Sequence, residues 1–356
     1  MLIPWKAFRT LSKKGFIPVI LSSCLFSLDV HQVHGQDQKV ADSLTLIFQA
    51  DTLKGLKKLE LLSELSFNEL NNRDLSLKYA KELIALSEAE NNDRYLLRGY
   101  SRIGYYHLFN GDLELALEAF FNCARIAVET KQENNEATTY LSIADVYSTM
   151  GSYDNAELYY NKSIGLLRDL NDSTALASAL LNAGDFYFYN ENYEKALQYF
   201  EESGPIFEKY NHLTGIAYYL GNSAMIYTIQ GKDSLAMDHF NEAIGILEEL
   251  EDYYPVSVYL TYVSDIYLRE NNYARALSSA ERSLELAANN NLIEQISGAN
   301  LQLSEVYEKA ENPEKALIYY KDHILYRDSL KSIETVQQMA DLRTDFEVSQ
   351  KQIEVD

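Results

Sequence analysis

One stretch, which recurs along the chain at a fixed spacing, decides the fold. Residues 177–210 read ASALLNAGDFYFYNENYEKALQYFEESGPIFEKY. Apolar residues stand at helical spacing as far as Tyr189, the polar break 190–192 follows, and the pattern resumes from Tyr193 to Tyr210. Residues that recur at i, i+3, i+4 and i+7 lie on one face of a helix. The stretch therefore predicts a hairpin of two helices.

This hairpin pattern returns every 40 residues with no insertion or deletion, in three columns of equivalent positions. The columns are Ser76, Ala116, Ala156, Ala196, Ala236, Ala276 and Ala316; Phe67, His107, Tyr147, Tyr187, Tyr227, Tyr267 and Tyr307; and Ala80, Phe120, Tyr160, Phe200, Phe240, Ala280 and Tyr320. Small residues let two helix axes approach, and aromatic residues fill the gaps beside that contact. A fixed period of this length predicts a solenoid, in which each unit buries its apolar face against its neighbours.

Composition agrees with an all-helical chain that is a poor partner for nucleic acid. Of 356 residues, 47% are hydrophobic and only 5 are proline, so a continuous helical core can form. The formal net charge of −22 repels nucleic acid and anionic lipid, so we expect neither as a partner. Tyrosine is frequent, at 28 residues, and we interpret most of it as padding between helices.

The first 35 residues resemble a targeting segment. Four basic residues, the last of them Lys14, precede an apolar run over 15–28, which suits a signal-peptide core but is short for a membrane span. Cleavage after Gly35 is predicted; the alternative is lipidation at Cys24, which ends the lipobox-like run 21–24. We therefore expect an exported, periplasmic protein, in which Cys123 is a small core residue.

No catalytic motif is found in the sequence. It has no phosphate-binding glycine loop, no His-Glu-x-x-His, no Gly-x-Ser-x-Gly and no Cys-x-x-Cys. The histidines that follow the leader stand far apart in the sequence. We expect no catalytic residues, no metal site and no cofactor in this chain.

The small–aromatic alternation resembles the tetratricopeptide repeat, whose hairpins usually have 34 residues. The resemblance covers residues 58–328, and its first unit departs most, with Glu64 and Ser76 in place of the small pair. It implies an all-α, right-handed superhelical solenoid in which the first helix of each hairpin lines a concave groove. Six additional residues per unit would lengthen the helices.

Two polar ladders would then line this groove. One position after the small residue of each first helix stand Tyr105, Asp145, Asp185, Met225, Asp265 and Glu305, and two positions before it stand Arg102, Ser142, Asn182, Asn222, Tyr262 and Gln302. From these ladders the predicted ligand residues are Arg102, Asp145, Asn182, Asp185, Asn222, Asp265 and Glu305. The ladders would hydrogen-bond an extended peptide or protein segment, and the carboxylates favour a basic one. The alternative is a solvated face, or acids that pair with their neighbours.

The family resemblance extends to two of these residues and has one gap. Asn182 and Asn222 are similar to the asparagines that hold the peptide backbone in peptide-binding members of the repeat family. The lysines that accompany them in relatives binding a terminal carboxylate are not evident, so such a ligand is not expected.

After the seventh hairpin, Met339, Leu342, Phe346 and Ile353 give a short heptad-like seam. It indicates a connector or a homodimer through this helix; the alternative is a helix folded back onto the last repeat. Residues 333–354 resemble the helix that ends the repeat array in membrane-bound signalling proteins of the Bacteroidetes type. Residues 253–260 are most similar to arrays that carry a class III adenylate/guanylate cyclase output. The chain contains neither the membrane span nor the metal-binding aspartates of such a protein, so no cyclase activity is assigned to it.

These observations predict a signal peptide (1–35), a leading helix (36–57), seven 40-residue hairpins (58–328) and an extended C-terminal helix (329–356). The predicted function is an extracytoplasmic binding and sensing module of a cyclase-type signalling protein, truncated before its span and effector. The alternative is a periplasmic scaffold that mediates protein–protein interaction.

Overall fold

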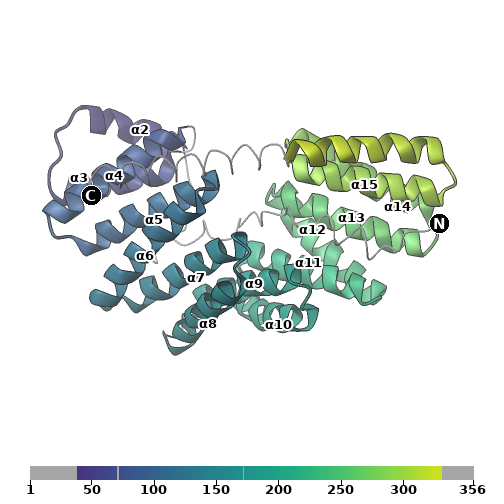
Figure 1. Cartoon of the computed structure of the whole chain (residues 1–356), viewed down its shortest axis with the longest axis horizontal. Coiled ribbons are helices and arrows are strands. Elements are labelled where there is room, and N and C mark those ends of the chain that lie inside the picture. Colours follow the sequence, from purple (N-terminus) through teal and green to yellow (C-terminus); the bar gives the residue numbers. More distant parts are fainter. Residues whose placement is uncertain (1–37, 70–71, 171, 331–356) are drawn as a thin grey trace, which may run out of the picture. The chain divides into compact units, whose positions relative to one another are not determined.

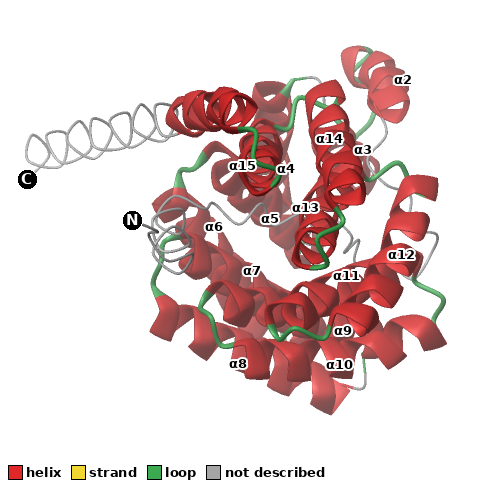
Figure 2. Ribbon diagram, turned by 90° about the vertical axis from the view of Figure 1, so that its right-hand side faces the viewer, coloured by secondary structure: helices red, strands yellow, loops and turns green. Residues whose placement is uncertain are grey.

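The computed structural model describes residues 38–69, 72–170 and 172–330, and in these ranges the regular structure is helical (Figures 1 and 2). A leading helix, α2 (Gln38–Gln49), precedes a series of helical hairpins. The hairpins are α3 (Leu56–Asn68) with α4 (Arg73–Ala89), α5 (Asp93–Asn110) with α6 (Leu113–Glu129), α7 (Glu133–Thr149) with α8 (Tyr153–Leu170), α9 (Ser173–Tyr189) with α10 (Tyr193–Lys209), α11 (Leu213–Ile229) with α12 (Asp233–Glu249), α13 (Tyr253–Arg269) with α14 (Tyr273–Asn289), and α15 (Ile293–Lys309) with the helical residues 313–330. The predicted all-α hairpin solenoid is confirmed. The predicted leader and the heptad-like seam from Met339 onward lie outside the described residues.

Short turns of one kind join the helices, because the same local chemistry recurs at nearly every junction. The second residue after most helices has a left-handed backbone. Asn91, Asn211, Asn271 and Asn291 are examples, with φ between 50° and 59°. The next helix is often capped by asparagine, as where the Asn92 side chain accepts from the backbone N–H of Tyr95. The helices are thus ended and restarted within three residues, which keeps the 40-residue period.

The small column forms the centre of each hairpin. Ala116, Ala156, Ala196, Ala236 and Ala276 have no exposed surface. Opposite them the first helix is also small: a Cβ added to Gly184 would lie 2.4 Å from the Phe200 ring. Ser264 keeps the same close approach by donating its hydroxyl to the Ala276 carbonyl at 2.8 Å. The predicted contact between two small columns, with aromatic rings beside it, is therefore present.

The chain divides into two compact units, with the boundary between Asn182 and Ala183 inside α9. We call the described residues up to Asn182 the N-terminal unit, and residues 183–330 the C-terminal unit. Each is described by itself. In the described residues, no helix is both long and apolar enough to cross a membrane.

Candidate functional site

The two polar ladders hydrogen-bond to each other between the first helices of successive hairpins. The Tyr105 and Ser142 hydroxyls lie 2.8 Å apart. The Asn182 amide donates to Asp145 at 3.4 Å, and the Asn222 amide donates to Asp185 at 2.7 Å. Each contact joins residues 37 apart, that is, one ladder of a hairpin to the other ladder of the next. These side chains tie neighbouring hairpins together.

In the N-terminal unit this seam is sealed from solvent. Asp145 is 1% exposed and Asn182 is 5% exposed. The Tyr160 hydroxyl donates a second hydrogen bond to Asp145, at 2.7 Å. Burial nevertheless raises the pKa of Asp145 to about 7, because desolvation of the carboxylate outweighs its hydrogen bonds from Tyr160 and Asn182. Both predicted ligand residues thus have their polar groups satisfied inside the protein.

Arg102, the third predicted ligand residue of the N-terminal unit, lies on α5. Its guanidinium carbon stands 4.4 Å from the centre of the Phe67 ring on α3. This is a cation–π contact between successive first helices. Arg102 therefore also joins two hairpins.

In the C-terminal unit the corresponding seam is only partly closed. Asp185 is partly buried, while Asn222 is 6% exposed. The Asn222 side-chain oxygen accepts from the hydroxyl of Tyr259, a residue of the following hairpin, at 2.7 Å. Asp185, Asn222 and Tyr259 thus form a chain of hydrogen bonds across three hairpins.

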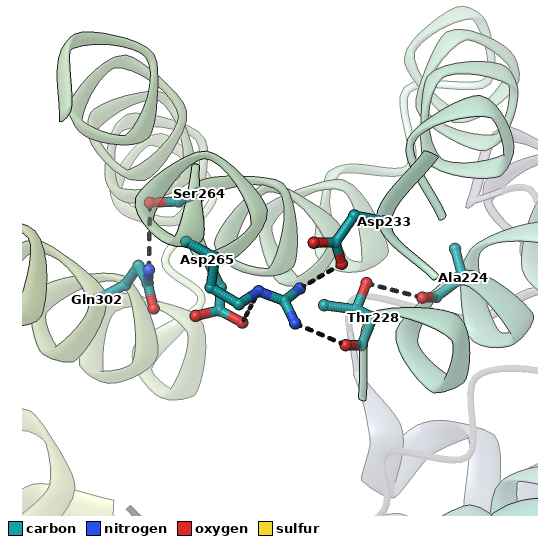
Figure 3. A network of polar contacts seen from close by, with 7 residues as sticks. Ala224, Thr228, Asp233, Ser264, Asp265 and Gln302 are labelled. Carbon is teal, nitrogen blue, oxygen red and sulfur yellow. Dashed lines mark hydrogen bonds and ion pairs between the residues drawn. The ribbon is translucent and has the colours of Figure 1, made fainter. Parts of the chain in front are cut away.

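Asp265 takes part in a polar network around Arg269, at the end of α13 (Figure 3). The guanidinium of Arg269 lies 2.8 Å from Asp233 and 3.7 Å from Asp265, and it donates to the carbonyl of Thr228 at 3.0 Å. Beside this network, the Gln302 amide donates to the Ser264 hydroxyl at 3.2 Å. Glu305, the last predicted ligand residue, is partly buried on α15.

A second group of polar side chains gathers on the first helices of the C-terminal unit. We call it the inner cluster; it consists of Asp185, Tyr189, Tyr218, Asp252, Tyr254 and Glu294, from α9, α11, α15 and the start of α13. The Tyr218 hydroxyl donates to Asp252 at 2.9 Å. Desolvation raises the pKa of the Tyr218 and Tyr254 hydroxyls, and carboxylates, including Asp252 for Tyr218 and Glu294 for Tyr254, raise it further.

In the inner cluster, groups from α9, α13 and α15 influence the hydroxyl of Tyr189. Its side chain is 44% exposed, yet its pKa is raised well above the usual value, first by desolvation and then by Asp185, Tyr254 and Glu294. Glu294 is on α15, three hairpins away from α9 in the sequence. Packed helices are about 8–10 Å apart and charges act weakly beyond about 10 Å, so a flat stack would keep these groups apart. The influence of Asp185 and Glu294 on the pKa of Tyr189 therefore places these carboxylates of α9 and α15 near its hydroxyl.

Sequence reasoning missed five members of the inner cluster, namely Tyr189, Tyr218, Asp252, Tyr254 and Glu294. A signal for most of them was present. Tyr189 lies four residues after Asp185, and Tyr218 lies four residues before Asn222. Tyr254 and Glu294 lie eight residues before the ladder residues Tyr262 and Gln302. Extending each ladder by one or two helical turns would have found these four.

The inner cluster combines carboxylates with phenol groups, and this donor set suits recognition of a cation. Among the described residues, no three or more His, Cys, Asp or Glu side chains are placed to hold a metal ion. Cys123, on α6, is buried, and burial raises the pKa of its thiol. A protonated, enclosed thiol is a poor nucleophile.

Residues 95–169 and 175–249 match the model of the tetratricopeptide repeat family. These two segments are similar to tetratricopeptide repeats. The hairpins on either side of them keep the same 40-residue period and the same helical pairing. No curated protein matches the chain in sequence.

Three solved structures illustrate the similarity of the fold. A Rap protein complexed with Competence and Sporulation Factor has 16% identity and a TM-score of 0.60, covering 94% of this chain and 89% of its own. The Rap conjugation gene regulator of plasmid pLS20, in complex with the Phr* peptide, has 15% identity and a TM-score of 0.56, covering 80% and 79%. A signal transduction ATPase with a tetratricopeptide repeat sensor, from Pyrococcus horikoshii, has 15% identity and a TM-score of 0.56, covering 91% and 55%. At these identities the similarity shows the fold alone.

Proposed function

We propose that this chain is the recognition module of a signal-transduction protein, and that the inner cluster binds a peptide or protein segment with a basic side chain. The observation that carries the proposal is the position of Tyr189, which is 44% exposed and whose pKa is raised by the nearby carboxylates of Asp185 and Glu294. A cation in such a place gains from carboxylates in poorly solvated surroundings and from tyrosine ring faces. Two of the structurally similar regulators are described as bound to a peptide or a signalling factor.

This proposal retains only some of the predicted ladder residues as ligand residues. Asp185 remains a ligand residue, because its carboxylate is partly exposed beside Tyr189. Asn222 positions Asp185 through its hydrogen bond. Asp265 and Glu305 lie further along the same unit and would meet the rest of an extended ligand. Asp145, Asn182 and Arg102 hold hairpins of the N-terminal unit together.

The overall charge of the protein supports a basic partner. With a formal net charge of −22, the chain attracts cationic molecules and repels acidic ones at a distance. This long-range attraction raises the rate of encounter, whereas the inner cluster would decide which segment remains bound.

A direct test uses three pools of fluorescent random heptapeptides whose central residue is fixed as arginine, glutamine or glutamate. We expect the arginine pool to bind the full chain at least tenfold more tightly than the glutamate pool in a fluorescence anisotropy titration. The double variant Asp185→Asn with Glu294→Gln should reduce binding of the arginine pool to the level of the glutamine pool.

The matched control removes the same charge from exposed positions on second helices. Glu249→Gln with Glu285→Gln lowers the negative charge equally, but both residues face solvent on α12 and α14. This control should keep most of the binding. An equal loss of peptide binding in both double variants would show that the attraction is non-specific. Equal binding of the three pools would show that the inner cluster does not select a basic side chain.

The finer parts of the predicted function remain proposals. We propose that the protein is exported, because residues 1–35 have the composition of a signal peptide. N-terminal sequencing of the protein from the periplasmic fraction tests this proposal. A first residue of Gln36 supports cleavage by a conventional signal peptidase, and a lipidated Cys24 supports the lipoprotein alternative. An intact Met1 contradicts export.

We also propose that ligand binding is passed along the array to a cyclase-type effector. Each hairpin contacts mainly its neighbours, so a small change of pitch at each contact would add up towards the C-terminal helix. Reading the genomic DNA beyond codon 356 tests the arrangement. An open frame that encodes an apolar span and a catalytic domain supports a sensor, and a stop codon supports the scaffold alternative.

A further inference from the structure

The last hairpin has two large aliphatic side chains on a face where each of the other hairpins has at most one. Two columns of the second helices, two and nine residues after the small column, are exposed throughout the described residues. In the earlier hairpins they hold Lys78, Glu118, Leu158, Gln198, Asp238 and Ser278, and Ala85, Arg125, Gly165, Pro205, Gly245 and Glu285. In helical residues 313–330 the same columns hold Ile318 and Leu325, which are 57% and 65% exposed. Only here do both positions carry large aliphatic side chains.

A further hairpin of the array does not explain this apolar face. Phe207 illustrates how a second helix meets the next hairpin: it is 2% exposed, and its ring lies 2.3 Å from where a Cβ on Gly215 would be. The equivalent position of the last hairpin is Arg327, which pairs with Asp328 at 2.8 Å. At this position, the side that would receive another hairpin is therefore charged.

The spacing of the outward residues indicates a different kind of partner. Ile318 and Leu325 are seven residues apart, which is two helical turns. In the sequence the same step is interrupted by Ser332 and resumes with Met339, Phe346 and Ile353. A seven-residue step keeps residues on one face of a helix, as in helices that wind around each other, whereas hairpins of this array follow a 40-residue period.

Charged residues on the two edges of this face indicate that the partner helix is parallel and has the same sequence. On one edge stand Glu314 and Lys321, and on the other stand Lys315 and Asp322. In a parallel pair related by a two-fold axis, opposite edges meet, so Glu314 faces Lys315 of the second copy and Lys321 faces Asp322 of the second copy. In an antiparallel pair the edge with Lys321 would meet itself. Flanking charges of this kind select partner and orientation.

We propose that the outward face formed by Ile318 and Leu325 pairs with the same face of a second copy of this chain, in parallel and in register. The dimer contact then begins inside the last hairpin of the array. It would be rigidly connected to α15, because the Ser304 hydroxyl donates to the Ala316 carbonyl at 2.9 Å and the Tyr307 and Tyr319 rings stack 5.4 Å apart.

Cysteine cross-linking in the full chain tests both the contact and its register. Leu325→Cys, in a Cys24→Ser background, should give a disulfide-linked dimer on mild oxidation, because in-register pairing brings the two copies of position 325 together. Cys123 is buried and should not react. The control Leu158→Cys places the thiol at the column of Ile318 in an inner hairpin, where the side chain is 48% exposed, and it should stay monomeric on the same gel.

Sedimentation velocity of the same full chain measures the contact without cross-linking. Ile318→Asp with Leu325→Asp should halve the mass of the species or weaken the dimer at least tenfold, whereas Leu158→Asp should not; circular dichroism checks that both variants stay helical. Lys321→Glu should weaken the dimer, and adding Asp322→Lys should restore it. A monomeric wild-type chain, or a dimer that these changes leave intact, overturns the proposal. A monomer in which the thiol at position 325 resists labelling would show that the chain's own residues cover this face, and this outcome overturns it as well.

Discussion

Asp145 and Asp185 stand at the same position of successive hairpins, yet their surroundings differ. Asp145, in the N-terminal unit, is 1% exposed and accepts a hydrogen bond from Tyr160 in its own hairpin. Asp185, in the C-terminal unit, is partly exposed, and the residue equivalent to Tyr160 is Phe200, which has no hydroxyl. The two carboxylates have the same amide partner from the next hairpin, Asn182 or Asn222.

This comparison shows that a position in the repeat does not by itself determine what a side chain does. The hydroxyl of Tyr160 closes the seam around Asp145, and the carboxylate loses its water. Phe200 offers Asp185 no such bond; Asp185 stays partly exposed, and its charge raises the pKa of the Tyr189 hydroxyl. One seam therefore encloses its carboxylate, and the other leaves a charge on the inner cluster.

The largest predicted effect is the pH dependence that Asp145 gives to stability. Its pKa is raised from 3.8 to about 7 in the folded protein, so folding takes up a proton between these values. Its contribution to stability is therefore complete below about pH 4 and is lost as the pH rises through 7, by up to roughly 4 kcal/mol. Asp145→Asn should remove this dependence. Urea unfolding followed by circular dichroism from pH 4 to 8 measures it.

The control for this experiment is Glu249→Gln, which removes an exposed carboxylate from α12. Its stability should follow that of the wild type at every pH. If the difference between Asp145→Asn and the wild type stays constant from pH 4 to 8, the carboxylate of Asp145 is not sealed in the folded protein.

The second prediction concerns the hydroxyl that closes the N-terminal seam. At pH 8, Tyr160→Phe should lower the unfolding free energy by about 1.5–3 kcal/mol, because a buried carboxylate loses a donor. Tyr259→Phe should lower it by only about 0.5–1.5 kcal/mol, because Tyr259 donates to the neutral amide of Asn222. Equal losses in urea unfolding would mean that the two seams do not differ in charge.

The third prediction tests a close approach between two hairpins of the C-terminal unit. A Cβ on Gly221 would lie 2.1 Å from the ring of Tyr259, which is 1% exposed. Gly221→Ala should therefore destabilise the protein by about 1–3 kcal/mol through overpacking. Gly245→Ala, in α12 with no atom within 4 Å of the added Cβ, should stabilise it by up to about 1 kcal/mol. Thermal and urea unfolding of both variants give the comparison, and a neutral Gly221→Ala would mean that the ring can move aside.

The sequence predicted the hairpins well because their signals are local and repeated. The 40-residue period, the small column from Ala116 to Ala276 and the asparagine-rich turns specify the helices and their pairing without knowledge of distant contacts. Because seven hairpins share one register, the pattern stays clear even where one hairpin departs from it, as at Ser76 in the first.

The candidate site was harder to predict, because it depends on partners outside the hairpin. Nothing near Asp145 in the sequence shows that Tyr160 and Asn182 reach it, or that Asp185 lacks the first of these contacts. The proximity of Tyr189 to Glu294 depends on the curvature of the C-terminal unit, and curvature follows from many small packing angles. Periodicity gives the face of a helix on which a residue lies, but not the groups that stand opposite.

The smallest predicted effect belongs to the Arg269 network, which joins hairpins of the C-terminal unit by charge (Figure 3). Arg269 and Asp233 are 37% and 29% exposed, so water screens their attraction, and Arg269→Gln should cost about 0.5–1 kcal/mol at low salt. Half a molar sodium chloride should remove most of this difference.

Arg125→Gln removes a more exposed pair with Glu129, four residues away, and should cost about 0.3–0.5 kcal/mol. The loss of unfolding free energy in Arg269→Gln could instead be independent of salt and larger than that in Arg125→Gln. This outcome would mean that the hydrogen bond from Arg269 to the Thr228 carbonyl, and not the charge of Arg269, holds α13 to α11. The C-terminal seam would then resemble the sealed seam of Asp145 in relying on short polar contacts shielded from solvent.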